Sequence, residues 1–201
     1  MKILMVDVDG VLVHGRPSDG LPLFTYLERA LGLKAALLRQ AFFKIYWTDI
    51  VTGRDAIEPR LAEVLGKIAP HLRARKLIDY WFENDSRLDH GLLDDLAALR
   101  AGGTKMFLAT NQEHMRAAYL MDTLKLSSRF DGIFYSAALG HQKPATEFFR
   151  LATERAGIPA REIGFIDDVE ANIEAARQFG WKAMQWTPGS TLRDAVAAFS
   201  A

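Results

Sequence analysis

Short, continuous runs of apolar residues recur along the chain at the length of buried β-strands. They lie at residues 2–6, 105–109, 132–135, 162–166 and 182–185. Each run is continuous rather than alternating, which is typical of strands buried on both faces of a parallel sheet. The hydrophobic pattern therefore predicts a five-stranded sheet at the centre of the fold.

Helical patterns fill the intervals between the later apolar runs. Apolar residues recur at helical spacing over residues 91–101, 115–124, 146–156 and 169–179. Glycines follow three of these patterns, where a helix is expected to end. Strands that alternate with helices indicate βαβ units, so the sequence predicts an α/β fold with a doubly wound parallel sheet.

Residues 15–88 interrupt this alternation, because they contain helical patterns and no convincing strand. The helical stretches lie at 24–47, 55–70 and 75–86. We therefore predict a small helical insertion after the first strand, lying over the edge of the sheet. The predicted division assigns residues 1–14 and 89–201 to the α/β core and residues 15–88 to the insertion.

Composition and charge exclude several classes of protein. The chain has 201 residues, 49% of them apolar, and 25 basic residues balance 25 acidic ones. Zero net charge argues against nucleic acid or an anionic membrane surface as a general partner. The absence of cysteine excludes disulfides, thiolate metal sites and a cysteine nucleophile. No apolar run reaches the roughly 18 residues of a membrane span, and the first run is too short for a signal peptide. We expect a cytoplasmic protein, and no apolar stripe indicates its oligomeric state.

The first apolar run ends in two carboxylates, Asp7 and Asp9, followed by Gly10. Ligands of open α/β sheets bind beyond the carboxyl ends of the strands. Asp-Gly is a common turn pair, so Asp9 and Gly10 could simply form a turn. A turn does not explain Asp7, which would lose water at the mouth of a buried strand. Mg²⁺, which prefers carboxylate and carbonyl ligands, would relieve that cost.

Two further motifs combine polar groups with strand ends or helix starts. Thr110 and Asn111 follow the second run. Both residue types are good helix N-caps. Alternatively, a hydroxyl and backbone N–H groups at the start of a helix can bind an anion. Lys143 could be an ordinary solvated lysine. Pro144 restricts the backbone beside it and suits the first turn of the next helix, and a fixed lysine is what a phosphate site needs.

The fourth motif is a pair of adjacent acids, Asp167 and Asp168, after another apolar run. One of them could cap the following helix, but the second has no such explanation. Beside Asp7, these two carboxylates would repel strongly without a cation among them. The order of acid pair, threonine, lysine and acid pair, each beyond a strand, is far more specific than any single motif.

This ordered set resembles the haloacid dehalogenase-like hydrolase superfamily over nearly the whole chain. The family motif Asp-x-Asp-Gly corresponds to residues 7–10, and its strand ending in Thr or Ser corresponds to residues 107–110. Its lysine corresponds to Lys143 and its acidic pair to residues 167–168. The insertion resembles the family's first cap type, placed on a Rossmann-like core. The stretches FIDDVEANIEAARQFG and LATNQ resemble the branch that contains small sugar-phosphate phosphatases.

The resemblance implies a phosphatase that acts through an aspartyl-phosphate on a small phosphate ester, with sugar phosphates among the candidates. Asp7 would be the nucleophile, and Asp9 would protonate the leaving group and then activate water. Family members that cleave carbon–halogen bonds lack the second acid. Thr110, Asn111 and Lys143 would stabilise charge on the transferring phosphoryl group.

The resemblance also implies a Mg²⁺ cofactor. Its ligands would be the Asp7 carboxylate, the Asp9 backbone carbonyl and Asp168. Asp167 and Asn172 would orient these ligands and bound waters without contacting the metal.

The insertion is expected to decide which substrate binds, as a lid that excludes water. The candidate specificity residues are His14, Lys44, Trp47 and Arg54. The aromatic residues around Trp47 could instead form a plain helix core, and Arg54 could simply be solvated. Two other functions fit the motifs: a phosphomutase that uses the same Asp7 and Asp9, and a non-catalytic phosphate-binding or scaffolding protein.

Overall fold

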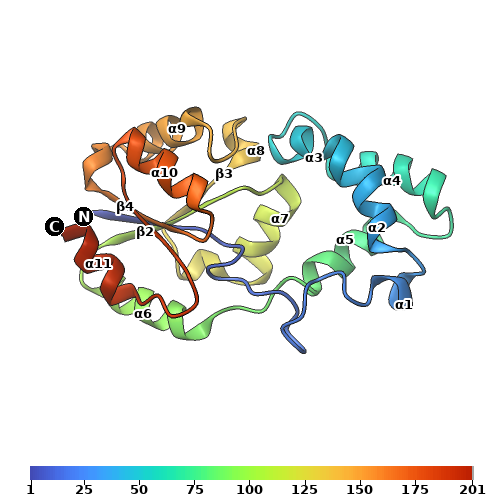
Figure 1. The fold of residues 1–201 in the computed structure, drawn as a ribbon, viewed down its shortest axis with the longest axis horizontal. Coiled ribbons are helices and arrows are strands. Elements are labelled where there is room, and N and C mark those ends of the chain that lie inside the picture. Colours follow the sequence, from blue (N-terminus) through green and yellow to red (C-terminus); the bar gives the residue numbers. More distant parts are fainter. Residues whose placement is uncertain (201) are drawn as a thin grey trace.

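The computed structural model describes residues 1–200, and a parallel five-stranded sheet forms its centre (Figure 1). The strands are β1 (Ile3–Val6), β2 (Lys105–Thr110), β3 (Gly132–Tyr135), β4 (Ile163–Asp167) and β5 (Lys182–Gln185). They are ordered β3-β2-β1-β4-β5, and every neighbouring pair is parallel. The predicted doubly wound sheet is confirmed, with strand limits that differ by at most one residue.

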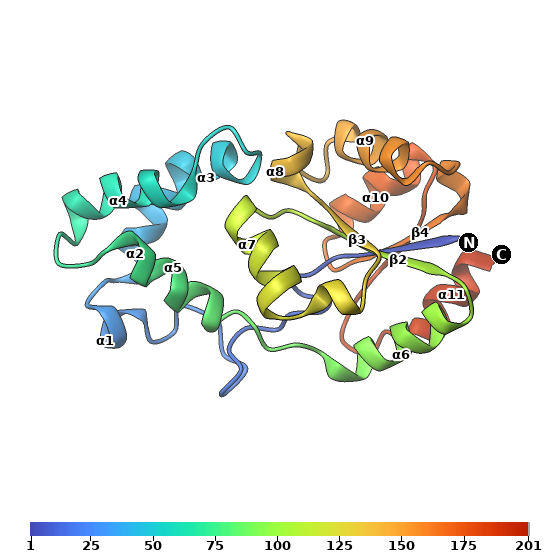
Figure 2. The ribbon, with the colours of Figure 1, turned by 180° about the vertical axis from the view of Figure 1, so that it is seen from behind.

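Helices cover both faces of the sheet (Figures 1 and 2). On one face lie α6 (His90–Ala101), the π-helical turn η2 (Tyr119–Thr123), the 3-10 turn η3 (Leu126–Ser128) and α11 (Leu192–Ser200). On the other face lie α8 (Ser136–Leu139), α9 (Thr146–Ala156), η4 (Ala160–Glu162) and α10 (Glu170–Phe179). Helix α7 (His114–Ala118) runs directly into η2.

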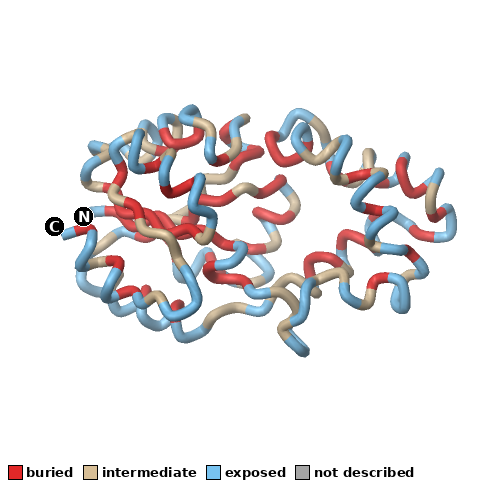
Figure 3. The backbone as a smooth tube through the Cα atoms, in the orientation of Figure 1, coloured by how far each residue is buried: buried red, intermediate tan, exposed pale blue. Residues whose placement is uncertain are grey.

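Strand β1 shows why the apolar runs are continuous. Leu4 and Val6 enter the hydrophobic cluster on one face of the sheet, and Ile3 and Met5 enter the cluster on the other. Successive side chains of a strand point to opposite faces, so a strand covered on both faces needs apolar residues at every position. Figure 3 shows this buried centre between exposed outer helix surfaces.

The insertion between β1 and α6 is helical, as predicted, but its first stretch is not a single helix. Its elements are α1 (Leu27–Leu31), α2 (Ala35–Leu38), the π-helical turn η1 (Arg39–Phe43), α3 (Lys44–Val51), α4 (Ile57–Ile68) and α5 (Ala74–Glu83). The helix predicted over residues 24–47 is broken at Gly32, which has a φ of 68° and donates its N–H to the Glu28 carbonyl at 2.9 Å. A left-handed glycine of this kind ends a helix.

The insertion has its own hydrophobic cluster and two connections to the core. Residues 27–82 supply this cluster, whose partly buried neighbours include Met115 and Tyr119 of the core. The connecting segments pair with each other, since His14 N donates to the Arg87 carbonyl and Asp89 N to the Leu12 carbonyl, each at 2.9 Å. The division of the chain at residues 15 and 88 lies at this pairing and stays a prediction.

None of the helices within residues 1–200 has both the length and the apolar character required to cross a bilayer.

Candidate active site

The chain turns back sharply beyond β1, and this turn presents Asp7 at the edge of the sheet. The Val8 carbonyl accepts hydrogen bonds from the N–H groups of residues 11–13 at 2.8–3.3 Å. Gly10 has a φ of 80°, and a Cβ at this position would overlap the carboxylate of Asp168. Glycine is therefore required here for two reasons: the left-handed backbone and the close approach of the Asp168 carboxylate.

Lys143 lies between the acids of β1 and β4. Its Nζ is 2.9 Å from Asp7 Oδ1 and 2.5 Å from Asp167 Oδ2, and it donates to the Ala109 carbonyl at 2.8 Å. The side chain of Asn111 fixes the main chain of this lysine, because it accepts from Lys143 N at 2.8 Å and donates to the Lys143 carbonyl at 3.0 Å. The loop before α9 is thereby attached to the end of β2.

The two acids after β4 have different surroundings. Asp167 is fully buried; Asn172 Nδ2 donates to both of its oxygens at 3.0 Å, and Val169 N donates to Oδ1 at 2.8 Å. Asp168 is partly exposed and lines a cavity. Oxygens of Asp7, Asp167 and Asp168 all lie within 4.8 Å of one another, a spacing that allows them to hold a metal ion.

Negative charge exceeds positive charge at this site. Lys143 pairs with Asp7 and Asp167, and the cavity that it lines also has Asp9 and Asp168 in its walls. Burial and, to a smaller extent, the charges of Asp167 and Asp9 raise the pKa of Asp7 to about 7, against the opposing effect of Lys143. Burial and the charge of Asp167 also raise the pKa of Asp168. Burial opposes the charge of the lysine, but Asp7 and Asp167 overcome it and raise the pKa of Lys143.

The helix-cap interpretation of Thr110 and Asn111 is excluded by the start of α7. Glu113 occupies the N-cap, and its carboxylate accepts the N–H groups of the first turn. Thr110 is buried beside the acid cluster and lines the same cavity as Asn111. Pro144, whose peptide bond with Lys143 is cis, precedes α9 and does not lie in its first turn.

A cavity of about 300 Å³ brings the predicted core residues together. Its walls include Asp7, Asp9, Gly10, Thr110, Asn111, Lys143, Asp168, Val169 and Asn172. Two larger cavities, of about 760 and 790 Å³, share Gly10 with it and extend toward the insertion and toward residues 186–190.

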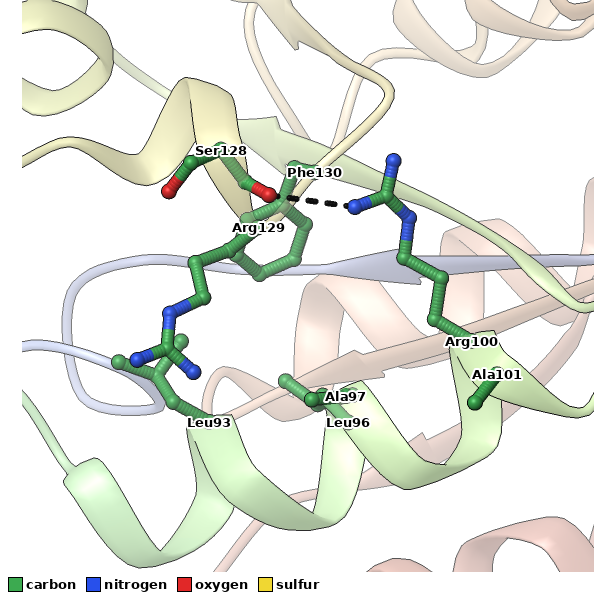
Figure 4. A pocket seen from close by; sticks show the side chains of 8 residues that line it. All are labelled: Leu93, Leu96, Ala97, Arg100, Ala101, Ser128, Arg129 and Phe130. Carbon is green, nitrogen blue, oxygen red and sulfur yellow. Dashed lines mark hydrogen bonds between the residues drawn. The ribbon is translucent and has the colours of Figure 1, made fainter.

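A separate cavity of about 300 Å³ lies between α6 and residues 128–130 (Figure 4). Its walls combine apolar side chains with Arg100 and Arg129, and Arg100 donates to the Ser128 carbonyl at 3.2 Å. Both arginines have acidic partners, Asp131 at 2.6 Å and Asp94 at 3.5 Å. Among residues 1–200, no carboxylate lines this cavity, so it is not the candidate site.

Of the four predicted specificity residues, one lines the larger cavities near the acid cluster. His14 lines both larger cavities, and its Nε2 lies 3.0 Å from the Val11 carbonyl. Trp47 packs on Trp81 with ring centroids 5.5 Å apart, which agrees with the plain helix-core interpretation. Lys44 and Arg54 are exposed, and Arg54 pairs with Asp49 at 2.9 Å. In the part of the chain that the structure describes, neither larger cavity has Lys44, Trp47 or Arg54 in its walls.

Three polar residues near the site were not assigned a role from the sequence. Gln112 donates to Asp9 Oδ2 at 2.7 Å. Asp85 lines the 760 Å³ cavity together with Asp9. Arg116 is fully buried and donates to the main-chain carbonyls of Phe82 and Asp85, which attaches the end of α5 to α7. Gln112 adjoins a motif, whereas Asp85 and Arg116 have no local sequence signal.

The model of the haloacid dehalogenase-like hydrolase family matches residues 1–180, most of the chain. The chain belongs to this family. Among curated relatives, the phosphoglycolate phosphatases of Salmonella paratyphi A and Escherichia coli K12 are 28% identical over 127 and 126 residues. These alignments cover 61% of this chain and 50% of each relative, so the chain spans about half the length of the curated relatives it matches.

Solved structures show that this haloacid dehalogenase-like hydrolase shares its fold over almost its full length. A family enzyme of Bacteroides thetaiotaomicron superposes with a TM-score of 0.79 at 19% identity, covering 96% of this chain and 97% of that one. A predicted family hydrolase of Porphyromonas gingivalis superposes with a TM-score of 0.75 at 22% identity, covering 98% and 97%. The helical insertion is thus part of the shared architecture.

Proposed function

We propose that this hydrolase is a Mg²⁺-dependent phosphatase that acts on a small phosphate ester, with sugar phosphates among the candidate substrates. The observation that carries the proposal is the position of Lys143, whose Nζ lies within 2.9 Å of both Asp7 and Asp167 beside a cavity that also contains Asp9 and Thr110. Phosphoryl transfer needs a nucleophile, an acid and groups that stabilise charge. Asp7 and Asp9 supply the first two, and Lys143 and Thr110 supply the third.

The proposed reaction has two steps. In the first, a carboxylate oxygen of Asp7 attacks phosphorus, the bond from phosphorus to the leaving oxygen breaks, and Asp9 gives its proton to that oxygen. In the second, Asp9 takes a proton from water, whose oxygen attacks phosphorus and releases Asp7. The ammonium of Lys143 and the hydroxyl of Thr110 stabilise the charge on the phosphoryl oxygens, and Asn111 keeps the lysine in place.

The donor set fits a hard divalent cation. It consists of carboxylates, and burial, which raises the pKa of Asp7 and of Asp168, disfavours their charged forms in a way that a bound cation would offset. Asp7, Asp168 and the Asp9 carbonyl would hold Mg²⁺, which supplies positive charge next to the phosphoryl group. Asp167 already accepts from Lys143, Asn172 and Val169, which suits a residue that orients the site rather than the metal's own ligand.

The comparisons support this proposal without deciding the substrate. The curated relatives are phosphatases of phosphoglycolate, a small ester, and the Bacteroides thetaiotaomicron enzyme has been solved with magnesium and inorganic phosphate. The 760 Å³ cavity beside Asp9 is large enough for a small leaving group. We propose that residues 15–88 form the cap over this cavity, with His14 at its entrance.

Phosphate release is the direct test. The protein is incubated with sugar phosphates, nucleotides and phosphoglycolate, with Mg²⁺ or with a chelator. We expect phosphate release that requires the metal. Isomerised product without free phosphate would indicate a phosphomutase instead. A folded protein that turns over none of these esters would favour a non-catalytic phosphate-binding role.

A further inference from the structure

Gln112 is a buried amide that contacts the proposed acid of the reaction. Only 4% of its surface is exposed, and its Nε2 donates to Asp9 Oδ2 at 2.7 Å. The same nitrogen lies 3.4 Å from Thr110 Oγ1. One side chain thus connects the acid that follows β1 with the hydroxyl at the end of β2.

The main chain of Gln112 is held as firmly as its side chain. Its carbonyl accepts from Ser136 Oγ at 3.1 Å and from Ala137 N at 3.2 Å. Ser136 is fully buried at the start of α8. Hydrogen bonds therefore hold both the main chain and the side-chain amide of Gln112, which fixes the position from which it contacts Asp9.

Asp9 is exposed beyond the end of β1, so its carboxylate needs a partner to keep a single orientation. A neutral amide is a suitable partner, since it donates a hydrogen bond but has no proton to exchange with the acid. This hydrogen bond engages Oδ2, so Oδ1 would be the oxygen that meets the leaving group. Small errors in the placement of a proton donor are costly for the rate.

We propose that Gln112 is a positioning residue that holds the Asp9 carboxylate in place for proton transfer to the leaving oxygen. The proposal rests on the phosphatase function above. The competing explanation is structural: the amide of Gln112 could use Asp9 only to satisfy its own buried donors. The two explanations differ in what they predict for leaving groups of different basicity.

The variant Gln112→Met keeps the length of the side chain and removes the donor. The measurement is kcat/KM, which covers formation of the phosphorylated enzyme, for two esters. One is the alkyl phosphate that the wild type hydrolyses fastest, and the other is p-nitrophenyl phosphate. We expect a loss of about 10- to 100-fold for the alkyl ester, whose alkoxide needs a proton. The loss for the aryl ester should be several-fold smaller, because a nitrophenolate leaves readily without one.

Two controls isolate the contact. Gln178→Met makes the same substitution at an exposed position on α10 and should leave both rates unchanged. In an Asp9→Ala background, Gln112→Met should cost nothing further with the aryl ester, since the group it positions is already missing. Thermal unfolding checks that each variant is folded; if Gln112→Met is not, Gln112→Asn, which keeps the amide but shortens its reach, takes its place.

Equal losses for the two esters, or an undiminished loss in the Asp9→Ala background, would overturn the positioning role while leaving the phosphatase proposal intact. So would wild-type rates in the folded Gln112 variant. Failure of the wild type itself to release phosphate from either ester overturns both proposals. The two failures are therefore distinguishable.

Discussion

The acid cluster at the edge of the sheet and the core of the helical insertion consist of chemically different side chains. The cluster buries Asp7, Asp167 and Lys143 around polar contacts of 2.5–2.9 Å. The insertion packs aromatic rings together: the partly buried Phe43 and Trp47 and the buried Trp81 are in mutual contact at centroid distances of 5.3–5.5 Å. The cluster buries charged groups, whereas the insertion has no charged side chain among the buried residues that the structure describes.

Because of this difference, we expect the cluster to determine the catalytic rate and the packed insertion to contribute to the free energy of folding. Buried charges lose hydration that their mutual attraction only partly restores, so they contribute little to the free energy of folding. Packed aromatic side chains contribute several kcal/mol each. Removing a carboxylate of the cluster should therefore change mainly the rate, and removing a packed aromatic ring of the insertion should change mainly the free energy of unfolding.

The largest effect is expected for Asp7→Asn. Removing the proposed nucleophile should lower kcat by at least about 1,000-fold. Stability should be unchanged or higher, because burial opposes the charge of Asp7 and raises its pKa to about 7. Phosphate release and urea unfolding measure the two quantities on the same sample. A variant that loses stability as severely as activity would break the contrast between the regions.

Lys143→Met is the substitution for which both quantities should fall. Loss of the ammonium should lower kcat by about 100- to 1,000-fold, as for other groups that stabilise transition-state charge. It also leaves the fully buried Asp167 without its cation, which should cost about 3–5 kcal/mol of unfolding free energy. Lys67→Met, at an exposed lysine paired with Glu63, is the matched control and should change neither. A stable, active Lys143 variant would contradict the central place given to this residue.

In the insertion, Phe42→Ala should act on stability alone. Phe42 is fully buried, and its removal leaves a cavity that should cost about 3–5 kcal/mol. Ile45→Ala removes a side chain that is 62% exposed on the neighbouring helix and should cost little. Chemical unfolding measures both. At temperatures where Phe42→Ala remains folded, its kcat for p-nitrophenyl phosphate should stay within a few-fold of the wild type.

The smallest expected effect is a pH-dependent change in stability caused by Asp85, which lies where the insertion meets the acid cluster. Burial and, to a smaller extent, the nearby charge of Asp9 raise its pKa to about 6, against the opposing effect of Arg116. A raised acid pKa means that the folded state binds more protons than the unfolded state between pH 3.8 and about 6. This contribution to stability is complete below pH 3.8 and disappears as pH rises toward 6.

The variant Asp85→Asn, which is neutral at every pH, isolates that contribution. The free energy of unfolding of the wild type, relative to the variant, should decline as pH rises through this window and stay constant above it. A difference that is independent of pH from 4 to 7, monitored by urea unfolding, would show that Asp85 is not affected by its burial.

The core site could be predicted from the sequence because the register of the parallel strands brings the residues that follow them together. Val6 pairs with both Leu108 and Ile166, so residues just beyond these positions necessarily meet at one edge. Short motifs at strand ends are therefore sufficient to identify Asp7, Thr110 and the acids of β4. Even the lysine, which lies in a loop, is indicated by the proline beside it.

The insertion was less predictable, because no register fixes its helices. Gly32 breaks a stretch whose apolar spacing alone indicates one helix. The contacts of Gln112 and Arg116 depend on how a turn and two distant helices pack, which local pattern does not record. The sequence predicts Lys44 and Arg54 as specificity residues, but which way each side chain points depends on the helix packing, and both are exposed.

The central claim is that Asp7 carries the phosphoryl group during turnover, and rapid acid quenching tests it most directly. The enzyme is mixed with Mg²⁺ and its fastest substrate, quenched within one turnover, digested, and its peptides are analysed by mass spectrometry. We predict a phosphoryl adduct on the peptide that contains Asp7, which disappears when turnover is complete and is absent from Asp7→Asn. An adduct on another residue, or continued phosphate release by Asp7→Asn, would contradict the claim.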